Sequence, residues 1–286
     1  RPPSKSMITD TGRAADRQYT NSKTAKDCIS ISSPSTASEY GSENRPLGPK
    51  PANSSQNKAN SGRPTAIRCS EALPGTNMTP TVSIIIPVRN QWKLTEACLR
   101  SLAEHTPQDG IQVLVMDNGS TDDTSTQCAP LGTALFGSRF RHIPLGHNRN
   151  FGPACNEGAR AADADYLFFL NNDTLLTAGW LPPLLDAFAR QPDLGATGPL
   201  LLYPDNRVQH AGVTFTPTWQ VTHLYQFFPR NHPVLFKKRT VQALTGAPLM
   251  IPAGLFTSCG GFFEEYRNGY EDLDLCAQIR GKGLVL

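Results

Sequence analysis

Residues 1–79 lack the residue types that build a hydrophobic core. All 13 Phe and all 3 Trp of the 286-residue chain lie after position 79, and the first part is instead rich in Ser, Thr, Asn, Pro, Lys and Gly. Such a segment cannot bury enough apolar surface to offset the entropy lost on ordering it. We therefore expect residues 1–79 to be a disordered polar tail, or a linker to an upstream domain, and residues 80–286 to fold.

The expected folded part has no excess of positive charge. Residues 1–79 carry 11 Lys and Arg against 6 Asp and Glu, whereas residues 80–286 carry 16 against 18, so the net charge of +3 comes from the tail. A slightly acidic domain argues against nucleic acid as the main partner.

Cysteines in a disulfide or zinc arrangement are also lacking. The chain has 7 Cys, an odd number, and no two of them stand at CxxC spacing. Several lie within apolar stretches, which is typical of free, buried thiols in a reducing compartment.

No run reaches the roughly 18 apolar residues of a membrane span, and no signal peptide is visible. We expect a cytoplasmic protein without a transmembrane segment, with peripheral association at the inner face of the membrane as an option. Because the sequence starts at Arg1 rather than Met and stops inside the apolar run 283–286, we expect a fragment, truncated at its C-terminus.

Beyond residue 80, strand and helix patterns alternate. Short β-branched or apolar runs predict strands, and segments with apolar residues on one face predict helices. We predict strands at 81–87, 111–116, 139–143, 166–170 and 246–252, and helices at 93–104, 154–162, 180–190 and from about 271. A further helix start is expected near Ser120 and Asp123. Residues 203–240 show little periodicity and predict long loops.

This order predicts an α/β fold with a mainly parallel sheet flanked by helices. Asp117 and Asp173 each follow a predicted strand directly. Ligands bind at the carboxyl ends of such strands, so we expect both carboxylates to face one crevice.

Five segments together resemble glycosyltransferase family 2, the inverting enzymes of the GT-A (nucleotide-diphospho-sugar transferase) fold. They are Val-Ser-Ile-Ile-Ile-Pro-Val-Arg-Asn (82–90), Met-Asp-Asn-Gly-Ser-Thr-Asp (116–122), Asn-Arg-Asn-Phe-Gly-Pro-Ala-Cys-Asn (148–156), Phe-Leu-Asn-Asn-Asp-Thr (169–174) and Gly-Tyr-Glu-Asp-Leu-Asp-Leu (269–275). Residues 209–213 and 245–250 also look like the branch with rhamnosyl- and galactofuranosyl-transferases. The resemblance covers residues 81–286 and implies a nucleotide-sugar donor.

The resemblance assigns the donor site to loops after the strands. It implies that Pro87, Val88, Arg89 and Asn90 line the nucleotide pocket. Asp117 resembles the carboxylate that binds the base, which suits UDP or dTDP; alone, it reads equally well as a turn residue.

The segment before the 154–162 helix offers groups for the donor phosphates. Arg149 and Asn150 precede a helix N-terminus, and Gly152 lets the backbone come close to a ligand. For Arg149, an ordinary loop position is an equal alternative.

The metal motif of the family falls on residues 171–173. Asp173 is the expected ligand of a divalent cation, Mg²⁺ or Mn²⁺, because these ions take oxygen ligands and bridge donor phosphates. Asn171 stands where many members carry an acid, and Asn171 and Asn172 are expected to contact the donor. A simple strand-ending turn is the alternative.

The acidic segment resembles the acceptor side of the family's site. Asp272 matches the general base, and Glu271 would orient acceptor hydroxyls. The alternative is that these acids only stabilise a helix N-terminus, and this alternative is compatible with both roles. Asp274 is expected to be structural. Members often supply a histidine metal ligand some two dozen residues further on, beyond Leu286.

The sequence thus predicts an inverting, metal-dependent glycosyltransferase that moves a hexose or deoxyhexose from a UDP- or dTDP-sugar to a glycan, polysaccharide or glycolipid, in cell-wall or polysaccharide biosynthesis. Two alternatives stay open: a non-catalytic module that binds nucleotide sugar or glycan at a degenerate site, and a nucleotidyltransferase. The second lacks support because Pro87–Asn90 does not have the Gly-rich loop of those enzymes.

Overall fold

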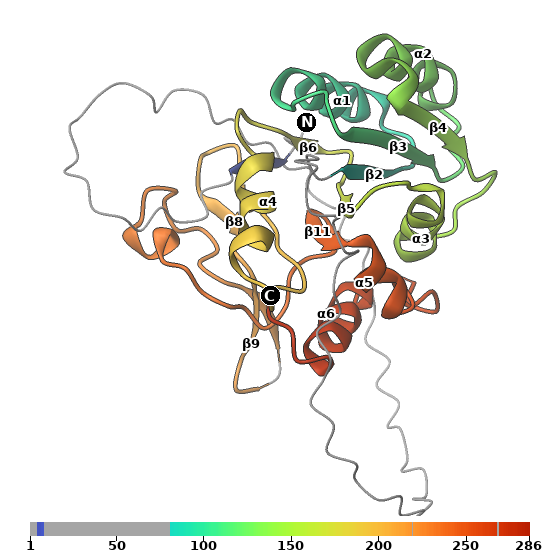
Figure 1. Cartoon of the computed structure of the whole chain (residues 1–286). Helices are drawn as coiled ribbons and strands as arrows, with labels where there is room; N and C mark the ends of the chain where they lie inside the picture. Colours follow the sequence, from blue (N-terminus) through green and yellow to red (C-terminus); the bar gives the residue numbers. More distant parts are fainter. Residues whose placement is uncertain (1–4, 9–80, 219, 268) are drawn as a thin grey trace, which may run out of the picture. The chain divides into compact units, whose positions relative to one another are not determined.

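The computed structural model describes residues 5–8, 81–218, 220–267 and 269–286 (Figure 1). Within the predicted tail, Lys5–Ile8 forms a short strand, β1, and the rest of the tail lies outside the described residues. From residue 81 onward strands and helices alternate, as expected, so the α/β class is confirmed.

The central sheet has the strand order β11-β5-β2-β3-β4, in which neighbouring strands are parallel except for the antiparallel pair β11 and β5. Its strands are β2 (Val82–Val88), β3 (Ile111–Asp117), β4 (Phe140–Pro144), β5 (Tyr166–Phe169) and β11 (Leu249–Pro252). A mainly parallel sheet is covered on both faces, which explains why its central strands β2 and β3 are buried along almost their whole length.

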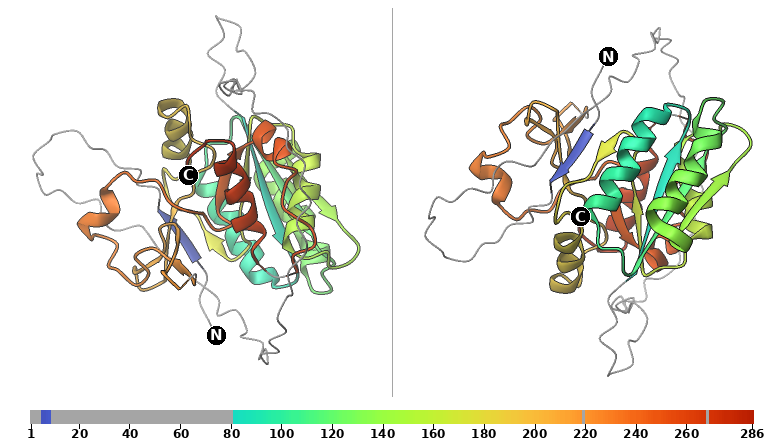
Figure 2. Two further views of the ribbon diagram at one scale, coloured as in Figure 1. Left: turned by 90° about the horizontal axis from the view of Figure 1, so that it is seen from below. Right: turned by 90° about the horizontal axis from the view of Figure 1, so that it is seen from above.

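Helices cover the sheet on both sides (Figure 2). One core cluster joins Ile84 and Ile86 of β2 to residues of α1 (Trp92–His105), α2 (Thr124–Phe136) and α4 (Leu181–Arg190). The other joins Ile85 to residues of α3 (Phe151–Ala161), α5 (Ala253–Ser258) and α6 (Glu271–Gly281). Alternate side chains of a strand point to opposite faces, so one apolar run supplies both cores.

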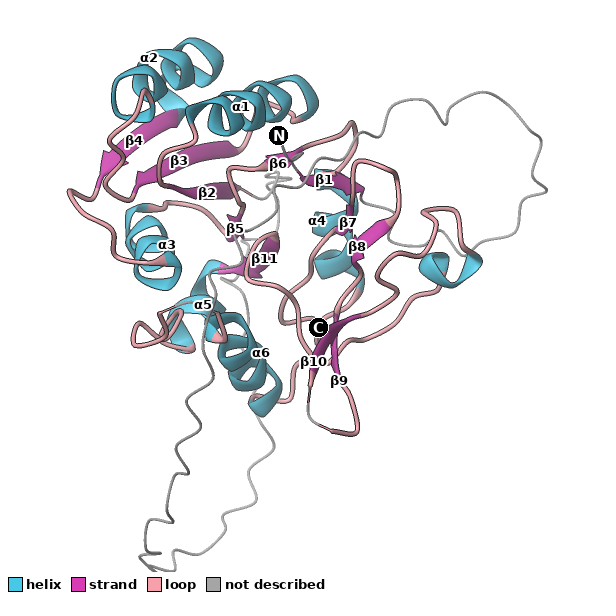
Figure 3. Ribbon diagram, turned by 180° about the vertical axis from the view of Figure 1, so that it is seen from behind, coloured by secondary structure: helices cyan, strands magenta, loops and turns pink. Residues whose placement is uncertain are grey.

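The segment 203–240, expected to be loop-rich, contains short elements between long connections (Figure 3). A second sheet has the order β6-β1-β7-β8, and β9 pairs with β10 in a hairpin. The bounds are β6 (Thr174–Leu175), β7 (Leu200–Leu202), β8 (Val208–His210), β9 (Val213–Phe215), β10 (Val221–His223), η1 (Gly137–Arg139) and η2 (Pro233–Phe236). Strands of three residues are too short to show a periodic pattern in sequence.

The register brings the predicted site segments to one edge of the sheet. Val88 of β2 pairs with Asp117 of β3, so these two strands end side by side. The N–H of Leu170, just after β5, donates to the carbonyl of Ile85. The turn that follows β5 therefore begins at the same carboxyl edge.

Among the residues that the structure describes, no helix combines the length and the apolar character needed to cross a lipid bilayer.

Candidate functional site

The loop after β2 is tied to the turn after β3. The N–H of Asn90 donates to Ser120 Oγ at 2.8 Å, and Asn90 Oδ1 accepts from the N–H of Thr121 at 2.7 Å. Asn90 adopts a left-handed φ of 58°, which Asn tolerates better than most residues. The predicted nucleotide loop is thus held in one conformation by its neighbour.

Among the other residues predicted in this loop, Val88 and Arg89 differ in the exposure of their side chains. The Val88 side chain is buried in the core, and its carbonyl accepts from the N–H of Asn118, so only its backbone borders the strand ends. Arg89 is exposed and Pro87 half-buried. A donor could meet the Arg89 side chain but not that of Val88.

Asp117 closes the turn after β3 and is only 4 % exposed. Its Oδ1 accepts from the N–H of Ser120 at 2.8 Å, which is the turn interaction that the sequence allowed. Its Oδ2 lies 3.3 Å from Nε2 of His142 on β4, a nitrogen for which the described residues provide no hydrogen-bond partner. The turn occupies one carboxylate oxygen and leaves the other facing His142.

Asn118 positions the next loop. Its Oδ1 accepts from the N–H of Arg149 at 2.7 Å, and its Nδ2 donates to Asn148 Oδ1 and to the carbonyl of Asn150, both at 3.0 Å. A Cβ on Gly119 would lie 2.8 Å from Cα of His147, so a glycine is needed for this approach. Asn118 lies in the 116–122 motif, but the motif did not predict it as a site residue.

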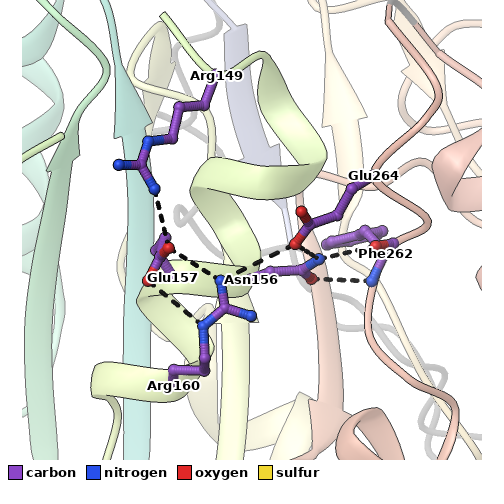
Figure 4. A network of polar contacts seen from close by, with 6 residues as sticks. All are labelled: Arg149, Asn156, Glu157, Arg160, Phe262 and Glu264. Atoms are coloured by element: carbon purple, nitrogen blue, oxygen red, sulfur yellow. Dashed lines mark hydrogen bonds and ion pairs between the residues drawn. The ribbon is translucent and has the colours of Figure 1, made fainter. Parts of the chain in front are cut away.

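Arg149 is engaged by protein rather than extended towards open space (Figure 4). Its Nη1 lies 3.0 Å from Oε1 of Glu157 on α3, and Arg160 binds the same carboxylate. Contact of Arg149 with a phosphate therefore stays a prediction and requires that this ion pair rearrange.

Gly152 was expected to let the backbone come close to a ligand, but the space beside it is taken by other parts of the chain. A Cβ at this position would lie 3.3 Å from Cβ of Phe262 and 3.8 Å from Cγ of Glu271. On the next turn of α3, Asn156 donates to the Phe262 carbonyl at 2.7 Å and accepts from its N–H at 2.9 Å (Figure 4). The N-terminal half of α3 is thereby fastened to the segment before α6.

Residues 171–173 form a turn after β5, beside the first turns of α1. The carbonyl of Asn171 accepts from the N–H of Thr174 at 3.2 Å, and Asn172 Nδ2 donates to Thr95 Oγ1 at 2.9 Å. Burial raises the pKa of the nearby Cys98 thiol, and the negative charge of Asp173 raises it further. Asn172 is thus used to attach the turn to α1.

Asp272 lies at the start of α6 and is held by backbone donors. Its Oδ2 accepts from the N–H of Gly246 at 2.9 Å and its Oδ1 from the N–H of Leu273 at 2.8 Å. Burial raises the pKa of Asp272, although these N–H groups and the charge of His223 lower it in part. Burial likewise raises the pKa of Glu271, and the charge of Asp272 adds to that rise.

Phe151 and Gly246 connect the two halves of the site. A Cβ on Gly246 would lie 3.2 Å from both Cβ of Asp272 and Cε1 of Phe151. Since Asn118 holds residues 148–150, contacts run without interruption from the turn of Asp117 to Asp272.

Two histidines near the acidic segment form a pair that the motifs did not predict. Nδ1 of His210 and Nδ1 of His223 lie 2.8 Å apart, so one ring donates and the other accepts. The sequence offered only isolated His residues in a loop-rich region. His210 lies on β8, which pairs with β7, and His223 on β10, which pairs with β9, so it is side-chain packing that joins the two rings. Asp274, expected to cap or to pair with Arg, accepts from Gln278 Nε2 at 2.8 Å.

The donor set at residues 171–173 is compatible with a hard cation but is not a complete cage. Asp173 and Asn171 supply oxygen donors, and the described residues contain no group of three or more His, Cys, Asp and Glu arranged to hold a metal. This fits an ion of the Mg²⁺ type, which is bound by one or two carboxylates together with substrate phosphates and water.

Two cavities border the second half of the described chain. One of about 680 Å³ lies between the β9–β10 hairpin and residues 266–274. Another of about 530 Å³ lies between α4 and residues 235–241, and none of the predicted site residues lines it.

A family model described as "Glycosyl transferase family 2" matches residues 83–252. The chain belongs to this family. The match spans β2, the turns after β3 and β5, and β11, and stops before the acidic segment of α6.

Three relatives of this family 2 chain come from bacteria. It is 32 % identical to "Uncharacterized protein y4gI" of Sinorhizobium fredii and 30 % identical to "O-antigen biosynthesis protein RfbC" of Myxococcus xanthus, each over 72 % of the chain. The chain spans only 23 % and 16 % of these two proteins. It is also 30 % identical, over 69 % of the chain and 70 % of the relative, to "N-acetylglucosaminyl-diphospho-decaprenol L-rhamnosyltransferase" of Mycobacterium tuberculosis.

Solved structures show the same GT-A fold at low identity. GalNAc-T7, crystallised with UDP, GalNAc and Mn²⁺, matches with a TM-score of 0.60 at 15 % identity over 74 % of this chain and 42 % of that one. The mannosyltransferase PcManGT of Pyrobaculum calidifontis, with GDP-Man and Mn²⁺, matches with a TM-score of 0.55 at 18 % identity, over 75 % and 56 %. The GT-A prediction is thus confirmed.

Proposed function

We propose that this domain transfers a hexose or deoxyhexose from a UDP- or dTDP-sugar to a hydroxyl of a glycan or glycolipid, with inversion at the anomeric carbon. The observation that carries the proposal is the position of Asp272. It is a carboxylate with a raised pKa, joined through Gly246, Phe151 and residues 148–150 to the turn that holds Asp117.

On this proposal Asp117 accepts a hydrogen bond from the imide N–H of uracil or thymine through Oδ2, the oxygen that the turn does not use, and the base takes the place of the contact with His142 Nε2. A carboxylate cannot make this bond to a base edge that offers only acceptors. The donor sugars and nucleotides named for the relatives differ, so the choice of a pyrimidine rests on Asp117.

Asp173 and Asn171 would hold a divalent cation, and the relatives crystallised with Mn²⁺ support this assignment. When bound, such an ion neutralises charge on the leaving diphosphate. The acceptor hydroxyl gives its proton to Asp272, its oxygen forms a bond to the anomeric carbon, and the bond from that carbon to the diphosphate breaks. A raised pKa makes Asp272 a better base than an ordinary carboxylate.

Calorimetric titration of the 286-residue chain with UDP and with dTDP, each with and without Mn²⁺, tests the donor site. We expect Asp173→Ala to abolish the Mn²⁺-dependent part of binding. Asp186→Asn, on the exposed face of α4, is the control and should bind as wild type. No nucleotide binding under any condition would refute the donor site.

Sugar transfer separates Asp272 from Asp173. We expect Asp272→Asn to bind nucleotide as wild type does and to lose transfer by ~10²–10⁴-fold, the usual contribution of a general base. Transfer is measured with a mixed panel of nucleotide sugars and glycoside acceptors. Equal loss of nucleotide binding in Asp173→Ala and Asp272→Asn would show that the roles are misassigned. Nucleotide binding without turnover in wild type would favour the non-catalytic module.

The names of the rhamnosyltransferase and O-antigen relatives support a role in polysaccharide biosynthesis. Attachment to a membrane and the cytoplasmic location are parts of the proposal.

A further inference from the structure

A groove of about 680 Å³ adjoins the acidic segment of α6. One wall is the β9–β10 hairpin, with Phe215, Gln220 and Val221, and the other is formed by Tyr266, Tyr270, Leu273 and Asp274. Tyr270 directly precedes Glu271 and Asp272 in sequence. The groove therefore borders the first turn of α6, which also carries the proposed base.

Aromatic rings on the α6 side form a row that reaches the groove. The ring centroids of Phe263 and Tyr266 are 5.4 Å apart, and those of Tyr266 and Tyr270 are 6.4 Å apart. Phe263 is 47 % and Tyr270 is 62 % exposed, which is unusual for large apolar side chains. Exposed apolar surface of this kind marks binding sites more often than scattered surface residues do.

The backbone of Tyr270 is held in a conformation that side chains rarely adopt. Its φ is 75°, in the left-handed region, and it immediately precedes α6. A non-glycine residue remains there only where the surrounding structure requires it, and such residues cluster at binding and active sites.

The charge at the groove is negative. Asp274 lines it, and the other lining residues are neither acids nor bases of the Lys or Arg type. A carboxylate accepts hydrogen bonds from hydroxyl groups but repels an anion, so an uncharged polyhydroxylated sugar ring fits and a uronic one does not.

We propose that this groove binds the uncharged pyranose of the acceptor, stacked on the rings of Tyr266 and Tyr270, and that it discriminates against anionic sugars. This inference rests on the proposed function, because it assigns the acceptor class of the same site. Flat aromatic faces suit the apolar faces of sugar rings, while Asp274 and Gln220 supply polar partners at the edge.

Saturation-transfer NMR with the 286-residue chain tests the groove. The neutral probes are methyl β-glucopyranoside and methyl β-N-acetylglucosaminide. Methyl β-glucopyranosiduronate is the anionic counterpart of the glucoside. We expect the neutral probes to bind and the uronate to bind at least ~10-fold more weakly. Tyr266→Ala and Tyr270→Ala should each weaken neutral binding ~3- to 10-fold, while Tyr→Phe at either position should retain it.

Phe236→Ala, which removes an exposed ring away from the groove, is the matched control and should not change binding. Calorimetric titration of the same variants with UDP and dTDP measures nucleotide binding at the donor site independently. A loss of nucleotide binding there would count against the proposed function and not against this groove. In a chain that binds nucleotide, three results would overturn this inference: no binding of any neutral probe, equal binding of the uronate, or unchanged binding in both Tyr→Ala variants.

Discussion

At the scale of single residues, Asp122 caps two helices at once. Its Oδ2 accepts from the N–H of Trp92 at the start of α1, and its Oδ1 from the N–H of Thr124 at the start of α2, both at 3.0 Å. Burial alone would raise the pKa of Asp122, but the hydrogen bonds from Thr124 and Trp92 outweigh it, and the net pKa is lowered. The carboxylate is therefore stabilised in its charged form.

We expect Asp122→Asn to lower the free energy of unfolding by about 1–2 kcal/mol at neutral pH, because the amide offers one acceptor oxygen to two N–H donors and leaves one of them without its bond. Because the folded pKa is lowered, this contribution is present above the unfolded pKa of about 3.9 and is lost as the pH falls through the folded value. Urea denaturation at several pH values should thus show the difference between wild type and variant shrinking on acidification. Asp123→Asn is the control, since the Asp123 side chain makes no capping bond; an equal effect there would contradict the assignment.

The sequence predicted a helix start at Ser120 and Asp123, and the capping part of that prediction is wrong. Ser120 belongs to the turn of Asp117 and receives the N–H of Asn90, while the helix starts at Thr124. Local spacing cannot distinguish Asp122 from Asp123, because the second donor, Trp92, lies at the start of α1, 30 residues earlier.

At the scale of elements, α3 packs closely on the central sheet through a glycine. A Cβ on Gly158 would lie 2.4 Å from Cγ2 of Ile85 on β2 and 3.3 Å from Cγ of Met116 on β3. This approach carries the N-terminus of α3, and with it residues 148–150, towards the ends of both strands.

We expect Gly158→Ala to destabilise the domain by about 1–3 kcal/mol through overpacking, although alanine is the better helix former. Gly254→Ala in α5 is the matched control, because a Cβ there meets no atom within 4 Å. The control should be neutral or slightly stabilising. Thermal unfolding of both variants measures this, and a stabilised Gly158→Ala variant would show that α3 is free to shift.

Strand and helix predictions were right where a pattern repeats. The five predicted strands and four predicted helices are present, with ends that differ by a few residues. Helix α5 and strands β1, β6, β8, β9 and β10 were missed, because elements of two to six residues are too short to show a periodic pattern.

At the scale of the whole described domain, two cores share one sheet and enclose the thiols. All five described cysteines are free and buried, as expected. Burial raises the pKa of Cys128 and of Cys276 to about 12 and that of Cys155 well above its ordinary value. The reactive thiolate is thus scarce in the folded state.

We expect these five thiols to resist 5,5′-dithiobis(2-nitrobenzoate) at pH 8 in the native domain and to react together on unfolding. Replacing Cys28 and Cys69 by Ser removes the two positions outside the described residues from the measurement. Absorbance of the released thionitrobenzoate follows the reaction. Fast labelling of any thiol without urea would contradict the burial.

The sequence by itself determined the α/β class, the order of the strands along the chain, and the placement of Asp117, Asp173 and Asp272 at element ends. These follow from apolar periodicity and from residues adjacent in the chain, and both are local properties. The family motifs added their roles, which remain proposals.

Only the tertiary structure decided which partners those residues meet. Arg149 pairs with Glu157, Asp272 receives the Gly246 N–H, and Tyr270 opens onto a groove walled by a distant hairpin. Asn156 and Phe262 are 106 residues apart, and no local pattern encodes such a contact. Chain packing around the two cores sets these distances, so the positions of Asp117 and Asp173 at strand ends were predictable from the sequence, whereas the groove beside α6 was not.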